Sequence, residues 1–365
     1  MATPAPVSGA PAVSVIVPAR NEEDCIGACL ESLVSQTGVS FEILLVDDGS
    51  TDRTRAIAAS FPQVKIVDPG PPPAGWSGKN NAVTAGSRAA QGEWLLFTDA
   101  DTAHLPDSLA RALAEARARK ADLLSYSPEQ EVRTLAEKAV MPVIFAELAT
   151  TFQPDEVSDP KSPAAAANGQ YILIERAAYN AVGGHAAVAG SLLEDVALAC
   201  TVKQSGRNIF FRYGGDIVRT RMYRSFPQLV EGWTKNLALL FPRSRDLAFW
   251  RAAEFIVLFA SLFLTIACFL QTKASMDTLR LVVASAALWF LFFRRIRRAH
   301  FSWDITLLAP LGLPLFSYLL LRSKIKHMDG QVSWKGRIYG ASTAQPSSNN
   351  SSAPAVAKQD LHSVP

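Results

Sequence analysis

Short apolar runs alternate with amphipathic stretches through the first part of the chain. Residues 13–17 (VSVIV) form a continuous β-branched run, which is typical of a strand buried on both faces. Similar runs predict further strands at residues 43–46, 64–67, 93–97, 122–126 and 168–174. Apolar residues at helical spacing predict helices at residues 24–35, 80–90, 108–120 and 192–204. Strands that alternate with helices indicate an α/β fold with a mostly parallel sheet, in which ligands bind at the carboxyl ends of strands.

The pattern changes near residue 252, where long apolar segments replace the alternation. Segments at about 253–271, 279–293 and 303–321 are candidates for helices in or on a membrane. The basic cluster RRIRR at 294–298 follows the second segment, and such clusters favour the cytoplasmic side. A full crossing by the third segment would carry the cations at 322–326 to the opposite side. We therefore favour an interfacial or re-entrant third segment, while a full crossing stays open.

These patterns divide the chain into four parts. We expect a disordered start at 1–12, a catalytic domain at 13–245, membrane segments at 246–330 and a tail at 331–365 that is disordered from about 342. Residues 135–152 are apolar but interrupted by Pro142, which fits a core or interfacial helix better than a full span.

Composition excludes several classes of function. The formal net charge of +3 is too small to indicate nucleic-acid binding. The four cysteines include no CxxC pair, which argues against a zinc site, and we expect Cys25 and Cys29 in the core. The first residues lack the features of a signal peptide. We therefore expect an integral protein of the cytoplasmic membrane whose catalytic domain faces the cytoplasm.

Asp99 and Asp101, in the sequence TDAD, follow a predicted buried strand. In an extended stretch the side chains of residues i and i+2 point the same way, so both carboxylates can face one ion. Carboxylate oxygens are hard ligands that select Mg²⁺ or Mn²⁺, and substrate phosphates often complete the coordination of such ions. An aspartate pair that caps a turn is the alternative.

Other polar residues follow the ends of predicted strands or begin predicted helices. Asp47 and Asp48 end a strand, where carboxylates can accept hydrogen bonds from a ribose or a base. Lys79 follows a flexible loop and can carry positive charge to a diphosphate. Glu194 and Asp195 begin a helix, where a carboxylate can also take a proton from an acceptor hydroxyl. Each of these residues also has a structural alternative. The aspartates can cap a turn, the lysine can be a solvated loop residue, and the acidic pair can be favoured by the helix dipole.

Several familiar motifs are absent from the sequence. There is no GxGxxG after the first strand, no GxxxxGK[ST] and no GxSxG. The five histidines form no pair with metal-ligand spacing. We expect His104 and His185 to lie at the surface, with His104 at most completing a metal shell.

Taken together and in order, VSVIVPARNEE, ILLVDDGSTD, GKNNAV, LLFTDAD and LLEDVALA resemble the family 2 inverting glycosyltransferases of the GT-A fold. The resemblance covers roughly residues 13–240. The sequel GWTKN and the apolar segments resemble the enzymes that act on lipid acceptors, including carotenoid- and hopanoid-associated ones. The QxxRW motif of processive synthases is absent, which favours the transfer of single sugars.

The resemblance implies a role for each matching residue. Asp195, beside Glu194, is the general base. Asp101 binds the metal, Mg²⁺ or Mn²⁺, together with Asp99, which also contacts the ribose. The nucleotide-sugar donor, expected to be a UDP-sugar, contacts the following residues: Pro18, Ala19, Arg20, Glu22, Asp47, Asp48, Lys79 and Asp99. The lipid acceptor lies toward Gly184, Trp233 and Lys235.

Two alternatives stay open. A polyprenyl-phosphate sugar synthase shares the fold but uses a phosphate acceptor, which needs little help from a base. A membrane protein that binds nucleotide sugars without turnover belongs to a different class, although the presence of Asp101 and Asp195 argues against it.

Overall fold

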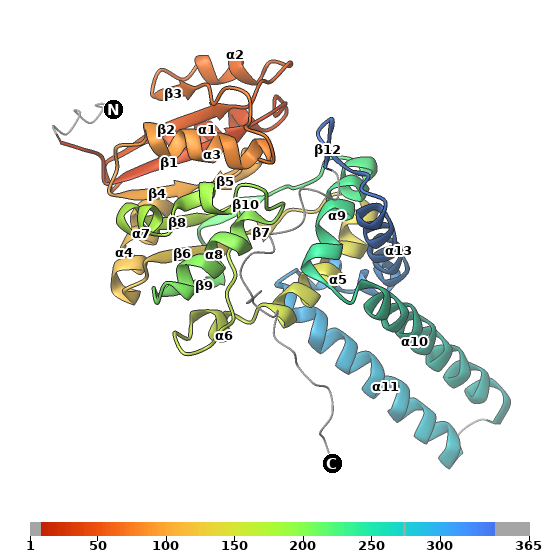
Figure 1. The fold of residues 1–365 in the computed structure, drawn as a ribbon. Helices are drawn as coiled ribbons and strands as arrows, with labels where there is room; N and C mark the ends of the chain where they lie inside the picture. Colours follow the sequence, from red (N-terminus) through yellow and green to blue (C-terminus); the bar gives the residue numbers. More distant parts are fainter. Residues whose placement is uncertain (1–8, 273–274, 340–365) are drawn as a thin grey trace. The chain divides into compact units, whose positions relative to one another are not determined.

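The computed structural model describes residues 9–272 and 275–339 (Figure 1). By packing, these residues form two compact units: one comprises residues 9–129 and 152–221, and the other comprises 130–151 and 222–339 without 273–274. The predicted catalytic domain ended at residue 245, whereas residues 130–151 and 222–245 pack with the C-terminal helices. The predicted disorder at 1–12 and from about 342 falls largely outside the described residues.

The first unit is built on a seven-stranded sheet in the order β3-β2-β1-β4-β8-β6-β9. The strands are β1 (Val13–Ala19), β2 (Phe41–Asp47), β3 (Val64–Val67), β4 (Trp94–Phe97), β6 (Leu123–Ser127), β8 (Ile172–Glu175) and β9 (Ile209–Tyr213). Strand β8 runs antiparallel to β4 and β6, and all the other neighbours are parallel. The prediction of a mostly parallel α/β sheet is therefore confirmed.

Helices cover both faces of this sheet (Figure 1). They are α1 (Ile26–Val34), α2 (Thr54–Ala59), α3 (Gly78–Ala89), α4 (Ser108–Arg119), α6 (Pro154–Ser158), α7 (Arg176–Ala181), the 3-10 helix η1 (Gly184–Val188) and α8 (Glu194–Gln204). Alternate residues of β1 serve two cores: Val15 packs in the core that contains α1 and α4, and Ile16 packs in the core that contains α3 and α8. This two-sided burial explains why β1 is continuously apolar. A smaller sheet joins β5 (Thr102–His104), β10 (Val218–Thr220) and β7 (Glu129–Gln130).

The second unit is helical apart from a small hairpin. It contains α5 (Leu135–Thr151), α9 (Phe226–Leu240), α10 (Ser244–Thr272), α11 (Met276–Ile296), η2 (Arg297–Ala299), α12 (Trp303–Thr306), α13 (Ala309–Met328), β11 (Val332–Trp334) and β12 (Arg337–Tyr339). Helix α13 packs against α5, α9 and α10. The apolar segment at 135–152 is thus a core helix, as one of its two interpretations predicted, and it contains Pro142.

Helices α10 and α11 lie side by side as a hairpin (Figure 1). Both are long and apolar enough to cross a membrane: an 18-residue stretch within Ser244–Gln271 has a mean hydropathy of 2.4, and one within Met276–Ala299 has a mean hydropathy of 1.6. Little of either helix is buried, and Phe263 and Phe290 are among their exposed side chains. Helix α13 differs because one of its faces is buried within the unit. How its segment meets a membrane stays a prediction.

Candidate active site

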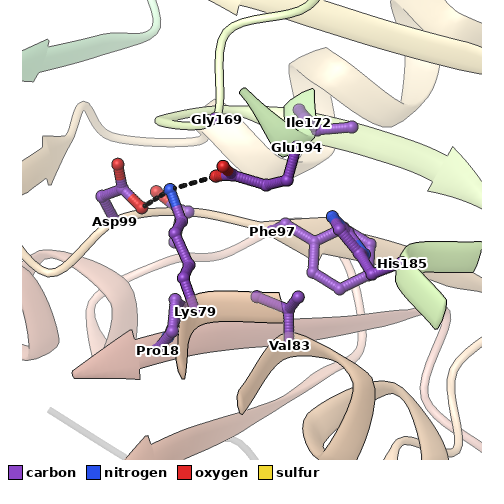
Figure 2. A pocket seen from close by; sticks show the side chains of 10 residues that line it. Pro18, Lys79, Val83, Phe97, Asp99, Gly169, Ile172, His185 and Glu194 are labelled. Atoms are coloured by element: carbon purple, nitrogen blue, oxygen red, sulfur yellow. Dashed lines mark ion pairs between the residues drawn. The ribbon is translucent and has the colours of Figure 1, made fainter. Parts of the chain in front are cut away.

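A small pocket lies at the carboxyl edge of the central sheet, where β1 and β4 end and where α3 and α8 begin. Its lining includes Pro18, Lys79, Phe97, Asp99, His185 and Glu194 (Figure 2). The structure therefore gathers residues from four separate predicted motifs around one space. This position agrees with the expectation that ligands bind at the strand ends.

Lys79 is the central cation of the pocket. Its Nζ lies 2.8 Å from Asp99 Oδ1 and 2.7 Å from Glu194 Oε1, as Figure 2 shows. Burial acts to lower the pKa of Lys79, but the two carboxylates outweigh it and raise this pKa well above its usual value. Lys79 is therefore a permanent positive charge and not the solvated loop lysine that was its structural alternative.

Hydrogen bonds at the start of α3 hold Lys79 in place. Ser77 Oγ accepts a hydrogen bond from the backbone N–H of Asn80, which caps the helix. The Asn80 amide in turn lies 3.1, 2.8 and 3.1 Å from the carbonyl oxygens of Val188, Ala189 and Ser191. These contacts tie α3 to the segment that leads into α8. Sequence reasoning missed Asn80, because no local pattern identifies the carbonyl groups that it binds.

Asp195 sits at the start of α8 with both carboxylate oxygens oriented. Oδ2 accepts a hydrogen bond from Gly169 N–H at 2.9 Å, and Oδ1 accepts one from Val196 N–H at 2.8 Å. Burial raises the pKa of Asp195 to about 6, the charge of Glu194 adds to this effect, and Lys79 opposes it. A carboxylate of this basicity is suited to accept a proton near neutral pH.

The backbone after β4 differs from the predicted extended stretch. Asp99 and Thr102 bracket a turn, in which Thr102 N–H and Oγ1 lie 3.3 and 2.7 Å from Asp99 O. The expectation that both carboxylates point the same way along an extended strand is therefore wrong, because β4 ends at Phe97. Asp99 faces the pocket and Lys79, whereas Asp101 is not one of the residues that line this pocket.

A divalent metal ion at this site would need oxygen ligands from the residues of this turn. Among residues 9–272 and 275–339, no group of three or more His, Cys, Asp or Glu side chains is placed to hold an ion. Asp99 and Asp101 still provide the hard oxygen atoms that Mg²⁺ and Mn²⁺ prefer. An ion of this kind takes most of its other ligands from water and phosphates, so a pair of carboxylates fits its chemistry.

The loops after β1 and β2 pack against each other beside the pocket. Asp48 N–H donates to Ala19 O at 2.9 Å, and Arg20 Nη1 donates to Asp48 O at 2.7 Å. Asp47 is buried, accepts a hydrogen bond from Ser50 N–H and pairs with an arginine of α2. Turn capping therefore accounts for Asp47. Glu22 N–H donates to Thr54 Oγ1 at 2.7 Å, which fixes the loop before α1. Donor contacts by these residues stay predictions.

The two histidines expected at the surface are both buried, so that expectation is wrong. His104 Nε2 lies 3.1 Å from Thr98 Oγ1, and burial lowers the pKa of His104 to about 3. The residue is a neutral component of the core. His185 lines the pocket, and its Nδ1 lies 3.0 Å from Tyr179 Oη. A lone histidine gives no sequence signal for burial of this kind.

The three residues predicted for the acceptor side occupy different environments. Gly184 begins η1 with a φ of +55°, and a side chain there would collide with Tyr179. Trp233 is buried in the core of the second unit, where its Nε1 donates to Met141 Sδ. Lys235 Nζ lies over the ring of Trp334 at 5.3 Å from the centroid. Their roles toward an acceptor stay predictions.

Comparisons with known proteins agree with this architecture. Residues 14–161 match the family model described as glycosyl transferase family 2. The chain is also similar to a 4,4'-diaponeurosporenoate glycosyltransferase of Staphylococcus aureus, with 29% identity over 348 residues that cover 92% of this chain and 90% of the relative.

Two solved structures are similar at low identity. One is the mannosyltransferase PcManGT from Pyrobaculum calidifontis in complex with GDP-Man and Mn²⁺, with a TM-score of 0.49, 17% identity and 88% of each chain covered. The other is S. aureus TarS 1–349 in complex with UDP-GlcNAc, with a TM-score of 0.42, 15% identity and coverage of 90% of this chain and 98% of that chain. Residues 14–161 thus match a glycosyl transferase family 2 domain, and this match together with the similar relative identifies the chain as a glycosyltransferase.

Proposed function

We propose that this glycosyltransferase transfers one sugar from a nucleoside diphosphate sugar, with UDP as the nucleotide, to a hydroxyl group of a lipid and inverts the anomeric configuration. The observation that carries the proposal is the meeting of a cation with carboxylates from two elements: Lys79 contacts Asp99 on one side and Glu194 on the other. Asp195 follows Glu194 directly and is oriented by Gly169.

The chemistry assigned to these residues is a single displacement. Asp195 takes the proton of the acceptor hydroxyl while the hydroxyl oxygen forms a bond to the anomeric carbon. The bond from that carbon to the diphosphate breaks on the opposite face, and the diphosphate leaves with the electron pair. Lys79 stabilises the negative charge that grows on the leaving group. Asp99 and Asp101 would hold a divalent cation such as Mg²⁺ or Mn²⁺, which would supply further positive charge to the diphosphate.

We place the protein in the cytoplasmic membrane through α10 and α11. The basic residues at 294–298 follow α11 and favour the cytoplasmic side, so a hairpin of two crossings leaves the preceding catalytic unit in the cytoplasm. A lipid acceptor agrees with this location. The similarity to a glycosyltransferase named for 4,4'-diaponeurosporenoate supports an apolar acceptor.

The relative's name also favours a second candidate, because it gives the acceptor as an acid anion. An anionic oxygen of a carboxylate or a phosphate attacks without first losing a proton. The acceptor of this chain would then resemble that of a polyprenyl-phosphate sugar synthase in needing little help from Asp195. A hydroxyl acceptor and an anionic acceptor thus differ in what Asp195 contributes.

Full-length protein in detergent, incubated with a panel of nucleotide sugars and extracted membrane lipids, tests the proposal. Mass spectrometry identifies the glycosylated lipid, and NMR of the product gives the anomeric configuration. Asp195→Asn should lower turnover about a hundredfold or more for a hydroxyl acceptor and leave it nearly intact for an anionic acceptor. Absence of transfer from every donor by the wild type, or a retained configuration, contradicts the proposed function.

A further inference from the structure

His185 occupies a position that the predicted roles leave unexplained. Its side chain is buried, and its ring lies edge-on to Phe97 with the ring centroids 4.7 Å apart. The same ring lines the pocket that contains Lys79 and Glu194, on the side of Phe97 in Figure 2. A buried imidazole at the border of the pocket can form a hydrogen bond with a substrate.

Tyr179 fixes the orientation of this imidazole. The backbone N–H of His185 donates to Tyr179 Oη at 3.0 Å, and Nδ1 lies 3.0 Å from the same oxygen. Gly184 permits this contact, because a Cβ at that position would lie 2.3 Å from the tyrosine ring. Nε2 has no hydrogen-bond partner within the part of the chain that the structure describes. One nitrogen is therefore held by the protein, and the other is left for a ligand.

The imidazole is also uncharged. Burial lowers the pKa of His185 to about 4; Glu194 acts to raise it and Lys79 to lower it further. At neutral pH the ring is a neutral hydrogen-bonding group. A phosphate would favour a cation, whereas a neutral N–H donor suits an uncharged hydroxyl group.

The geometry of the proposed displacement indicates which molecule carries this hydroxyl group. The proposed function places the leaving diphosphate toward Lys79 and Asp99, and the base at Asp195 beside Glu194. The transferred sugar must lie between them, so a group that lines the same pocket faces that sugar. We propose that the Tyr179 hydroxyl donates a hydrogen bond to Nδ1 of His185, which leaves the ring proton on Nε2, and that Nε2–H donates a hydrogen bond to a hydroxyl of the transferred sugar and helps to select it. This inference rests on the proposed function.

Binding measurements on the full-length protein in detergent separate the sugar from the nucleotide. Titration calorimetry with UDP and with the UDP-sugar that the wild type turns over gives two Kd values. His185→Phe keeps the ring beside Phe97 but removes Nε2–H. We expect its Kd for UDP to stay within about twofold and its Kd for the UDP-sugar to rise about tenfold, as for the loss of one hydrogen bond.

Substitution of His185 by glutamine or asparagine tests which ring nitrogen donates the hydrogen bond to the sugar. His185→Gln places an N–H donor near the position of Nε2 and should keep most of the affinity for the sugar. His185→Asn places its amide near Nδ1 and should lose that affinity as His185→Phe does. Tyr179→Phe keeps the aromatic packing and should weaken binding of the UDP-sugar while leaving UDP unaffected. Melting temperatures of all four variants verify that each is folded.

Deoxy analogues of the donor identify the hydroxyl group. One deoxy position should weaken binding to the wild type about tenfold and leave binding to His185→Phe unchanged. Equal affinities of wild type and His185→Phe for the UDP-sugar overturn the inference, as does equal behaviour of the Gln and Asn variants. If the wild type binds neither UDP nor any nucleotide sugar, the proposed function fails first, which is a different result.

Discussion

Lys79 Nζ lies 2.7 Å from Glu194 Oε1, so a lysine of helix α3 is paired with the residue next to the proposed base. The same ammonium contacts Asp99 at 2.8 Å. One cation thus joins the end of β4 to the start of α8. Because its two partners are carboxylates from different parts of the chain, Lys79 organises the pocket, and its role toward a diphosphate is the proposal that the next experiment tests.

Replacement of Lys79 by methionine should lower kcat by about a hundredfold or more, because the leaving diphosphate loses its stabilising charge. Lys79→Arg should retain part of the activity, since it keeps the charge with a different geometry. Steady-state kinetics with the preferred donor measure both effects. Lys65→Met, at an exposed position of β3, is the matched control and should be silent. Full activity of Lys79→Met contradicts the role of this lysine.

The pH dependence of turnover should report the ionisation of Asp195. Because burial and Glu194 raise its pKa to about 6, Asp195 is protonated and inactive below that pH, and kcat should rise as pH increases through about 6. Glu194→Gln removes the neighbouring negative charge and should move this acidic limb to lower pH. A pH–rate profile of each protein measures the shift. A limb that stays in place in Glu194→Gln shows that another group titrates.

Most strands were predictable because β1, β2, β4 and β6 are short apolar runs that end at polar residues. The run at 168–174 was placed too early, since Tyr171 N–H donates to Asn168 O in a turn and β8 begins only at Ile172. Its antiparallel direction was also not predictable. Periodicity reports burial, whereas direction depends on the path of the chain between strands.

The candidate site was predictable where a residue type and its position at a strand or helix end coincide, as for Lys79 and Glu194. Asn80 and His185 were missed because they contact residues far away in the sequence, the carbonyl of Val188 for Asn80 and the ring of Phe97 for His185. The double glycine before His185 was the only local hint, and it reflects contact with Tyr179. The turn after Asp99 was missed because the sequence TDAD is compatible with both an extended strand and a turn.

Gly169 should tolerate no side chain. A Cβ there would lie 3.1 Å from Lys79 Nζ and 3.4 Å from Asp195 Oδ2, so the methyl group of alanine displaces the contacts that orient both residues. Gly169→Ala should reduce kcat by about tenfold to a hundredfold with little change in melting temperature. Gly27→Ala, in helix α1 with 3.7 Å to its nearest neighbour, is the control and should leave activity unchanged. If Gly169→Ala has wild-type kinetics, close packing of Gly169 against Lys79 and Asp195 is not needed for activity, and the prediction is wrong.

Removal of the divalent cation should stop turnover. EDTA should abolish activity, and Mg²⁺ or Mn²⁺ should restore it, because the diphosphate leaving group needs positive charge beyond that of Lys79. Asp101→Ala should remove metal-dependent activity even at a high metal concentration. Asp68→Ala, at an exposed aspartate beyond β3, is the control. Turnover that is unchanged in the presence of chelator rejects a role for the metal.

Full-length protein should fractionate with membranes and resist extraction at alkaline pH, because α10 exposes apolar side chains such as Leu262, Phe263 and Phe269. In water these side chains would form an apolar surface that promotes aggregation. Phe263→Lys combined with Leu264→Lys places two charges in the middle of the span and should lower membrane insertion, since each charge costs about 3 kcal/mol there. Phe249→Lys, near the start of α10, is the matched control and should insert normally, because a lysine near a helix end can reach the interface. Recovery of wild-type protein in the soluble fraction without detergent contradicts the membrane hairpin.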